Sequence, residues 1–174
     1  MVSSMGFPPV ARADARVLIL GSLPGVESLR RHQYYAQLQN RFWWIMGEIA
    51  GADPALAYDA RLKRLLQHRI ALWDVCAAAE RAGSLDSNIV QNSVVPNDFA
   101  GFLHAHRGIE LICFNGGGAE KMYCRLVLPQ QSASQAAIRR TCLPSTSAAH
   151  AGMRPDEKLA RWRQALGNSI EVLA

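Results

Sequence analysis

The sequence predicts an α/β protein, a three-layer α/β/α sandwich around a four-stranded, mainly parallel β-sheet. Short apolar runs that are typical of buried parallel strands recur four times along the chain. Segments with the apolar spacing of helices separate these runs, and such alternation favours a parallel sheet with helices on both faces. The chain contains no internal repeat, low-complexity tract or linker, so we expect residues 1–174 to form one domain.

The four expected strands are followed by turn residues. Residues 16–20 and 69–75 are the first two strands, and a glycine follows the first of them directly. The third strand, residues 109–115, leads into three successive glycines. The fourth, residues 137–147, is expected to break at Pro144, because proline cannot donate a hydrogen bond to a neighbouring strand.

Five segments have the residue spacing and the end signals of helices. The first carries apolar residues at positions 42, 45, 46 and 49 and is expected to end at Gly51. In the second, Pro54 is expected in the first turn, and in the third Asn97 or Asp98 is expected to be the N-cap. The expected helices are residues 41–50, 54–68, 97–106, 119–128 and 154–167, whereas the polar residues 85–98 are expected to form a loop.

Composition limits the class of protein. Hydrophobic residues make up 49% of the chain and charged residues 19%, which argues against disorder. No apolar run approaches the roughly 20 residues that span a bilayer, and the first residues lack the features of a secretion signal. We therefore expect a cytoplasmic monomer with no membrane partner. The cysteines are far apart and form no CxxC pair, which favours buried thiols over disulfides; they are Cys76, Cys113, Cys124 and Cys142.

The net charge of +5 favours an anionic partner. Arg30, Arg31 and Arg139 are candidates for contacts with phosphate, although basic residues on helices can equally form solvated faces. His104 and His106 form the only close histidine pair, and no cysteine or carboxylate cluster accompanies them. Neither a metal nor another cofactor is therefore expected.

Ligands of open α/β sheets bind beyond the carboxyl ends of the strands, and the segments at these ends are rich in small and polar residues. The turn after the third strand, FNGGG, could hold a phosphate at a helix N-terminus. None of the segments carries the GxxxxGK[ST], GxGxxG or GxSxG spacing. A nucleotide-cofactor site or a serine hydrolase is therefore weakly supported.

Residues 33–44 combine aromatic and amide side chains between the first strand and the first long helix. Aromatic planes can stack on nucleic-acid bases, and Asn or Asp can read a base edge or position a water molecule. Phe42, Trp43 and Trp44 are successive residues of one expected helix and cannot all face a ligand, so most of them are expected in the core.

Four stretches within residues 17–149 resemble the uracil-DNA glycosylase superfamily, and within it the hypoxanthine-DNA (deoxyinosine) glycosylase group. These stretches are LILGSLPGVESLRRHQYYAQLQNRFWWI, IALWDVCAAAERAGSLDSNI, FNGGGAEK and LPSTSAA. The first is also similar to the mismatch-specific uracil and thymine glycosylases. The resemblance implies a monofunctional glycosylase that hydrolyses the N-glycosidic bond of uracil or hypoxanthine in DNA, without a metal.

The resemblance also implies roles for single residues at the base. Asn40 matches the catalytic asparagine of the hypoxanthine group, and Tyr35 matches the aromatic residue that stacks on the extruded base. Asp74 lies where relatives place an asparagine that reads the base edge, and an ionised carboxylate there would only accept hydrogen bonds. Capping of a helix at residues 77–79 is an alternative role for Asp74.

Other matched residues concern the sugar and the first turn. The turn Gly21–Gly25, which includes Pro24, is expected to present its backbone beneath the target sugar, with Ser22 beside the base. Relatives place an acidic or amide residue at the position of Ser22 or Leu23, and many place a histidine at the position of Leu143.

The stretch LPSTSAA, with Ser145, Thr146 and Ser147, is expected to grip the phosphates that flank the flipped nucleotide. Residues 147–153 would then enter the duplex, where Met153 could fill the gap left by the base and His150 could stack or touch phosphate. Met153 could instead pack as a hydrophobic staple of the last helix, and His150 could be a solvent-exposed loop residue.

Two other functions are consistent with the sequence. One is a non-catalytic DNA-binding module that retains the glycosylase fold, because the residues expected at Ser22 and Leu143 differ from those of relatives. The other, which the glycine patterns support less, is a Rossmann-like enzyme for a small nucleotide.

Overall fold

The structure is a computed structural model that describes residues 3–167 and 169–170. Its strands are β1 (Ser3–Met5), β2 (Val17–Gly21), β3 (Ile70–Asp74), β4 (Cys76–Glu80), β5 (Val95–Pro96), β6 (Leu111–Asn115) and β7 (Arg139–Leu143). Its α-helices are α1 (Val26–Arg31), α2 (Phe42–Ala50), α3 (Tyr58–Gln67), α4 (Phe99–Ala105), α5 (Gly117–Leu126), α6 (Ala133–Ala136) and α7 (Pro155–Leu166). Short 3-10 helices occupy Asp86–Asn88, Gln91–Ser93 and Leu128–Gln130.

The main sheet has four strands in the order β3-β2-β6-β7, and every neighbouring pair is parallel. Gly21 at the end of β2 lies opposite Asp74 at the end of β3, and Asn115 at the end of β6 lies opposite Leu143 of β7. The predicted fold class is therefore confirmed, as is the break of the last strand before Pro144. The four carboxyl ends meet at one edge of the sheet.

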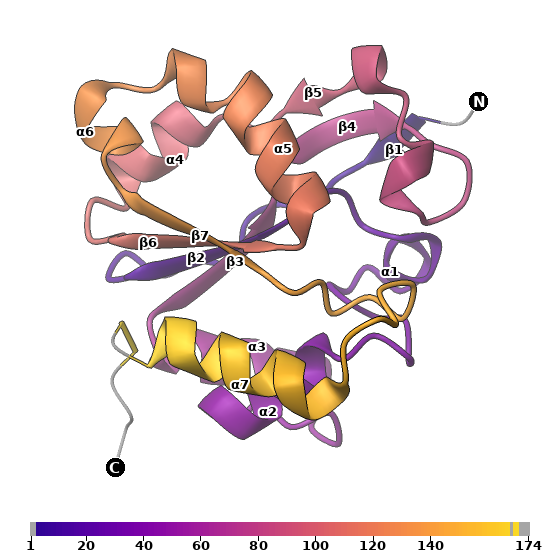
Figure 1. The fold of residues 1–174 in the computed structure, drawn as a ribbon. Coiled ribbons are helices and arrows are strands. Elements are labelled where there is room, and N and C mark those ends of the chain that lie inside the picture. Colours follow the sequence, from indigo (N-terminus) through magenta and orange to yellow (C-terminus); the bar gives the residue numbers. More distant parts are fainter. Residues whose placement is uncertain (1–2, 168, 171–174) are drawn as a thin grey trace.

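Helices cover both faces of this sheet. Figure 1 shows α2, α3 and α7 on one face and α4, α5 and α6 on the other. Alternate residues of β2 point into two separate cores, with Val17 and Ile19 on the α2 side and Leu18 and Leu20 on the α5 side. Each of these four side chains is fully buried, which explains why the strand reads as a continuous apolar run.

A second, three-stranded antiparallel sheet in the order β1-β4-β5 was not expected from the sequence. Its central strand, β4, contains three successive alanines, which have high helix propensity in isolation. Pairing of Ser3–Met5 with residues 78–80 provides backbone partners from a distant part of the chain and overrides this preference. Residues 85–98, expected to be a loop, contain two 3-10 turns and β5.

The helix ends agree with most of the expected signals. Gly51 ends α2 with a left-handed backbone (φ 68°), and the Asp98 side chain accepts a hydrogen bond of 2.9 Å from the backbone N–H of Gly101. The expectation for Pro54 is wrong, because α3 begins only at Tyr58. Phe42 and Trp43 are buried, as expected for core residues.

All four cysteines are free thiols. Cys76 and Cys113 are buried as expected, but Cys124 and Cys142 are exposed, because they face away from the cores on α5 and β7. Within the described ranges, no helix is both long enough and apolar enough to cross a membrane.

Candidate active site

A cavity of about 580 Å³ opens at the carboxyl ends of the main-sheet strands. Its walls come from the segments after β2, β3, β6 and β7, and also from the loop before α2 and the loop after β4. Met153, which was expected in the segment that enters the duplex, does not line this cavity. The lining includes Gly21, Ser22, Pro24, Gly25, Tyr35, Asn40, Asp74, Ser145, Thr146, Ser147 and His150.

Gly21 forms part of the cavity floor, because a side chain there would collide with its neighbours. A Cβ atom on Gly21 would lie 2.5 Å from Asp74 Oδ1 and 3.0 Å from the Tyr35 hydroxyl. Since Gly21 and Asp74 are also register partners in β2 and β3, the sheet itself holds the carboxyl in this place. The absence of a side chain at Gly21 therefore leaves room for both the carboxyl and the hydroxyl at the floor.

The Asp74 carboxyl is buried, and its Oδ2 atom has no hydrogen-bond partner in the described part of the chain. Burial, with the repulsion of the nearby Asp86 carboxylate, raises the pKa of Asp74 to about 7 despite the opposing charge of Arg81. Protonated and ionised forms therefore coexist near neutral pH, and the ionised form is the one that matches the expected role of an acceptor at the base edge. The alternative role as a helix cap is wrong, because the residues that follow form β4.

Tyr35 lines the cavity and places its hydroxyl near the cavity floor. Its backbone has a left-handed conformation (φ 53°), and one face of its ring stacks on Phe42 with 4.0 Å between ring centroids. The hydroxyl lies near Asp74 and Asn115, but forms no hydrogen bond with any described residue. Burial raises the pKa of Tyr35, so the hydroxyl stays protonated and can donate a hydrogen bond.

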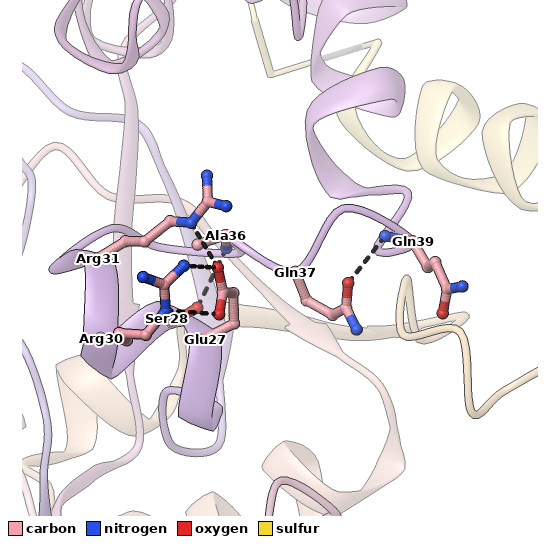
Figure 2. Close-up of polar contacts among 7 residues, drawn as sticks. All are labelled: Glu27, Ser28, Arg30, Arg31, Ala36, Gln37 and Gln39. Atoms are coloured by element: carbon pink, nitrogen blue, oxygen red, sulfur yellow. Dashed lines mark hydrogen bonds and ion pairs between the residues drawn. The ribbon is translucent and has the colours of Figure 1, made fainter.

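Asn40 closes a tight turn directly before α2. Its backbone N–H donates to the Gln37 carbonyl over 2.9 Å, and the Gln37 side chain accepts from the backbone N–H of Gln39 (Figure 2). The Asn40 side-chain oxygen accepts from the backbone N–H of Phe42 over 2.9 Å, so it caps α2 from one position before the N-cap residue Arg41. Its Nδ2 atom donates to no described residue and remains available to a ligand.

The loop after β7 is tied to the end of β6. Asn115 Nδ2 donates to Thr146 Oγ1, and Asn115 Oδ1 accepts from the Thr146 backbone N–H, both over 2.9 Å. The Thr146 carbonyl in turn accepts from the Arg41 backbone N–H over 2.9 Å. Thr146 is fully buried, so it positions this loop, whereas Ser145 and Ser147 are half-buried at the cavity wall.

Arg81, which was not expected at the site, stabilises the turn after β2. Its buried guanidinium donates to the carbonyl oxygens of Leu23 and Pro24, and to that of Gly83 in its own loop. Three carbonyls around one cation fix the turn without any regular secondary structure. The contacts of Arg81 with Leu23 and Pro24 join residues 58 and 57 positions apart, so no local sequence signal could reveal them.

Asp86, which was also not expected at the site, lies between the ends of two strands, β2 and β6. Its Oδ1 atom accepts a hydrogen bond of 2.5 Å from the Ser22 hydroxyl. Its Oδ2 atom faces the first turn of α5, where a Cβ atom on Gly118 would lie 3.0 Å away. The sequence shows only an acidic residue in a polar loop after a strand, and this signal does not identify a partner.

Met153 lines a neighbouring cavity of about 270 Å³, together with Leu143 and His150. Lys158 is buried and donates from Nζ to the His150 carbonyl over 2.7 Å, which holds residues 147–153 against α7. Lys158 also occupies the position where a hydrophobic staple would have its apolar partner, because Arg154 is the N-cap of α7. The described contacts therefore do not form the expected staple.

The arginines expected to contact phosphate differ in their positions. Figure 2 shows that Arg30 and Arg31 both donate to Glu27, over 2.7 and 2.5 Å, and these contacts lower the pKa of Glu27 to about 2. Arg139 begins β7 and lies opposite Leu111, the first residue of β6. The expectation that Arg139 lies near the site is wrong, because the cavity is at the other ends of these strands.

No group of three or more His, Cys, Asp or Glu residues in the described ranges could hold a metal ion. The cavity lining supplies three carboxyl groups, two phenols, three side-chain amides, an imidazole and several hydroxyls. This set can pair with both donors and acceptors of a planar heterocycle and can position a water molecule.

Comparisons with known proteins agree with this arrangement. Residues 8–167 match the family model of the uracil DNA glycosylase superfamily. Hypoxanthine DNA glycosylase from Methanosarcina acetivorans is 45% identical over 112 residues, which are 64% of this chain and 70% of that protein. The protein of the same name from Methanosarcina barkeri is 40% identical over 116 residues, 66% of this chain and 72% of that protein. The solution NMR structure of a candidate uracil DNA glycosylase from M. acetivorans is similar to the fold, with a TM-score of 0.75, 36% identity and coverage of 94% of this chain and 99% of that one.

Proposed function

The chain belongs to the uracil DNA glycosylase superfamily, and we propose that it is a DNA glycosylase that releases deaminated bases, hypoxanthine or uracil or both. The observation that carries this function is the pair of buried, unpartnered atoms at the cavity floor, Asp74 Oδ2 and the Tyr35 hydroxyl. A buried polar atom without a partner costs roughly 1–3 kcal/mol. Their position in an open cavity supports a ligand that completes both hydrogen bonds.

The edge of a deaminated base matches this pair. Uracil and hypoxanthine present a ring N–H beside a carbonyl, whereas cytosine and adenine present a ring acceptor beside an amino group. Asp74, when ionised, would accept from the ring N–H, and the Tyr35 hydroxyl would donate to the carbonyl. The pair thus supports selection of deaminated bases over the adenine and cytosine from which they arise.

The amide of Asn40 is the proposed catalytic group on the sugar side. Asn40 lines the same cavity as the base-reading pair, and its Nδ2 atom remains free while Oδ1 caps α2. As the bond to the base breaks, the sugar becomes cation-like and the base carries the bonding electrons away. A fixed amide contributes by positioning and by electrostatics rather than by taking a proton.

The rest of the cavity wall suits the flipped nucleotide's backbone. The turn Gly21–Gly25 would lie beneath the sugar, and Ser145 and Ser147 would bind the flanking phosphates from a loop that Thr146 holds in place. Residues 147–153 would enter the duplex. A deaminated base in a mismatch costs less to extrude, which adds selectivity before the pocket contacts form.

The test is strand cleavage by alkali after incubation with duplexes that carry a single hypoxanthine, a single uracil, or only normal bases. We expect cleavage at hypoxanthine or uracil and none at adenine or cytosine in the same position. A Tyr35→Phe variant should lose part of this preference, because it removes the donor but keeps the ring that stacks on Phe42. Tight DNA binding without cleavage of any duplex would favour the non-catalytic module instead.

A further inference from the structure

Hydrolysis of the N-glycosidic bond, on which this inference rests, needs a group that accepts a proton from the attacking water. The turn after β2 carries no acid, because Ser22 and Leu23 occupy the positions after Gly21. Asn40 cannot serve, since a neutral amide is not a base and its oxygen already accepts from Phe42. The proton acceptor must therefore come from another segment of the cavity.

Asp86 brings a carboxylate to the missing position from the loop after β4. Its Oδ1 atom accepts the Ser22 hydroxyl hydrogen over 2.5 Å, so it reaches the first residue of the turn that would lie beneath the sugar. Its Oδ2 atom faces Gly118 in the first turn of α5, at the end of the neighbouring strand β6. The Asp86 carboxylate therefore lies between the ends of the two central strands, β2 and β6, and lines the cavity.

The hydrogen bond to Asp86 also fixes what Ser22 can offer. A serine hydroxyl has one hydrogen, and here that hydrogen is committed to Asp86. Ser22 can thus only accept a further hydrogen bond, and donation to a carboxylate makes its oxygen a better acceptor. A water molecule beside this hydrogen-bonded pair would meet two acceptors, the Ser22 oxygen and the Asp86 carboxylate, which orients its oxygen lone pairs away from them.

Charged groups and a helix N-terminus surround Asp86. The guanidinium of Arg81 interacts with Asp86 from the start of the same loop, and the positive end of α5 lies beside Oδ2. Asp74 at the end of β3 is the other acidic group that it faces, and Tyr35 faces it from the loop before α2. Burial and the repulsion of Asp86 together raise the pKa of Asp74 to about 7, so Asp74 exchanges its proton near neutral pH.

We propose that Asp86 is the carboxylate that accepts the proton of the attacking water and that Ser22 holds this water beneath the sugar. The water oxygen forms a bond to the anomeric carbon while the bond from that carbon to the base nitrogen breaks. One water proton passes to Asp86, and the base leaves with the bonding electron pair. A base anion gains a proton from Asp74 when that carboxyl is protonated, or from solvent.

The experiment measures single-turnover excision from a hypoxanthine duplex between pH 5 and 9. Asp86→Asn keeps the shape of the side chain but cannot take a proton, so we expect a rate loss of about 100-fold or more. Ser22→Ala should lose about tenfold, because the water keeps one acceptor. Ser87→Ala, a change to an exposed neighbour in the same 3-10 turn, is the matched control and should retain the wild-type rate.

Three further measurements separate this role from a structural one. Asp86→Asn should bind the duplex at least as tightly as the wild type. Because a negative neighbour has been removed, the pKa of Asp74 should decrease in Asp86→Asn. Formate, a small carboxylate, should increase the excision rate of Asp86→Ala at least fivefold and should not increase that of Asn40→Ala.

An Asp86→Asn rate within threefold of the wild type would overturn the proposal. A large loss that formate does not restore, together with a lower melting temperature, would also overturn it and leave Asp86 a structural residue of the turn. Neither result affects the proposed function, which fails only if the wild-type protein excises no base.

Discussion

At the scale of single residues, the cavity depends on side chains whose hydrogen bonds are incomplete. Asp74, Tyr35 and Asn40 each keep at least one polar atom without a partner in the described chain, although their backbones are firmly held. Tyr35 even adopts a left-handed backbone, which a tyrosine avoids unless its surroundings enforce it. Such local costs are typical of functional sites, because a ligand recovers part of them.

Asn40 gives the most direct prediction at this scale. Asn40→Ala should reduce single-turnover excision by more than tenfold, which corresponds to about 1.4 kcal/mol of activation free energy. Loss of the cap on Phe42 should also lower the free energy of unfolding by about 1 kcal/mol. Gln39→Ala, in the exposed part of the same turn, is the control and should change neither quantity. A smaller loss of rate would leave Asn40 with only its capping role.

Asp74 predicts a pH dependence of stability. Its pKa in the folded protein is about 7, above the value of about 4 in an unfolded chain, so the folded state binds more protons between these pH values. Stability contributed by this group is therefore greatest below pH 4 and decreases as the pH rises to 7. In urea denaturation, Asp74→Asn should become more stable relative to the wild type as the pH rises from 4 to 8, by on the order of 1–4 kcal/mol. A pH-independent difference would contradict the raised pKa.

At the scale of elements, the site depends on segments that tertiary contacts hold in position rather than on regular structure. Asn115 fixes the loop after β7, Arg81 fixes the turn after β2, and Lys158 fixes the His150 carbonyl before α7. Each anchor is a polar side chain bonded to backbone or hydroxyl groups of a loop. The loops are thus preorganised before DNA binds, which reduces the entropy lost on binding.

The segment 147–153 gives a prediction at this scale. If Met153 fills the gap left by the extruded base, Met153→Ala should slow excision from duplex DNA but not from single-stranded DNA, because only a duplex has a stack to keep open. Thermal stability should change little, since Met153 is half-buried beside a small cavity.

Leu38→Ala is the comparison variant for Met153. Leu38 is 85% exposed in the turn before Asn40, so it is another large apolar residue that could enter a duplex from near the site. A duplex-specific loss in Leu38→Ala alone would move the insertion from residues 147–153 to this turn. Equal losses of Met153→Ala on both substrates, with a lower melting temperature, would make Met153 a packing residue.

At the scale of the whole molecule, the chain carries a net charge of +5, and its cavity lies at the side of the main sheet where the strands have their carboxyl ends. A parallel sheet places all its carboxyl ends, with their turns and helix N-termini, on one side. Figure 1 shows the turns that follow these strands gathered on the side of α1. We infer that this side faces the DNA, and that the described residues work as one domain around the shared sheet.

Salt dependence tests this orientation. Affinity for a hypoxanthine duplex should fall as salt rises, with a logarithmic slope of about −0.9 for each phosphate contact, and should depend little on the flanking sequence. Arg31→Ala should make the slope less steep if this side faces the duplex, whereas Arg139→Ala, at the opposite end of the sheet, should leave it unchanged. A flat dependence in the wild type would argue against an electrostatic interface. An effect of Arg139 alone would place DNA elsewhere.

The sequence by itself determined the main sheet, the helix ends at Gly51 and Asp98, and the strand ends where the cavity lies. These features depend on neighbouring residues, because apolar spacing, caps and turn residues act within a few positions of one another. It also predicted a shared site for Asn40, Asp74 and the turn Gly21–Gly25, which do line one cavity, since a short pattern of residues carries the resemblance on which they rest.

Only the tertiary structure decided which side chains meet. The Ser22–Asp86 hydrogen bond joins residues 64 positions apart, and Arg81 reaches a turn more than 50 positions away. The strand β4, with its three alanines, pairs with a distant N-terminal segment against its local helix propensity. Such contacts form when chain segments pack against one another, and the free energy that selects them comes from burial and pairing of the whole fold rather than from any local pattern. The carboxylate that the first turn lacks in sequence is therefore present at that turn in space.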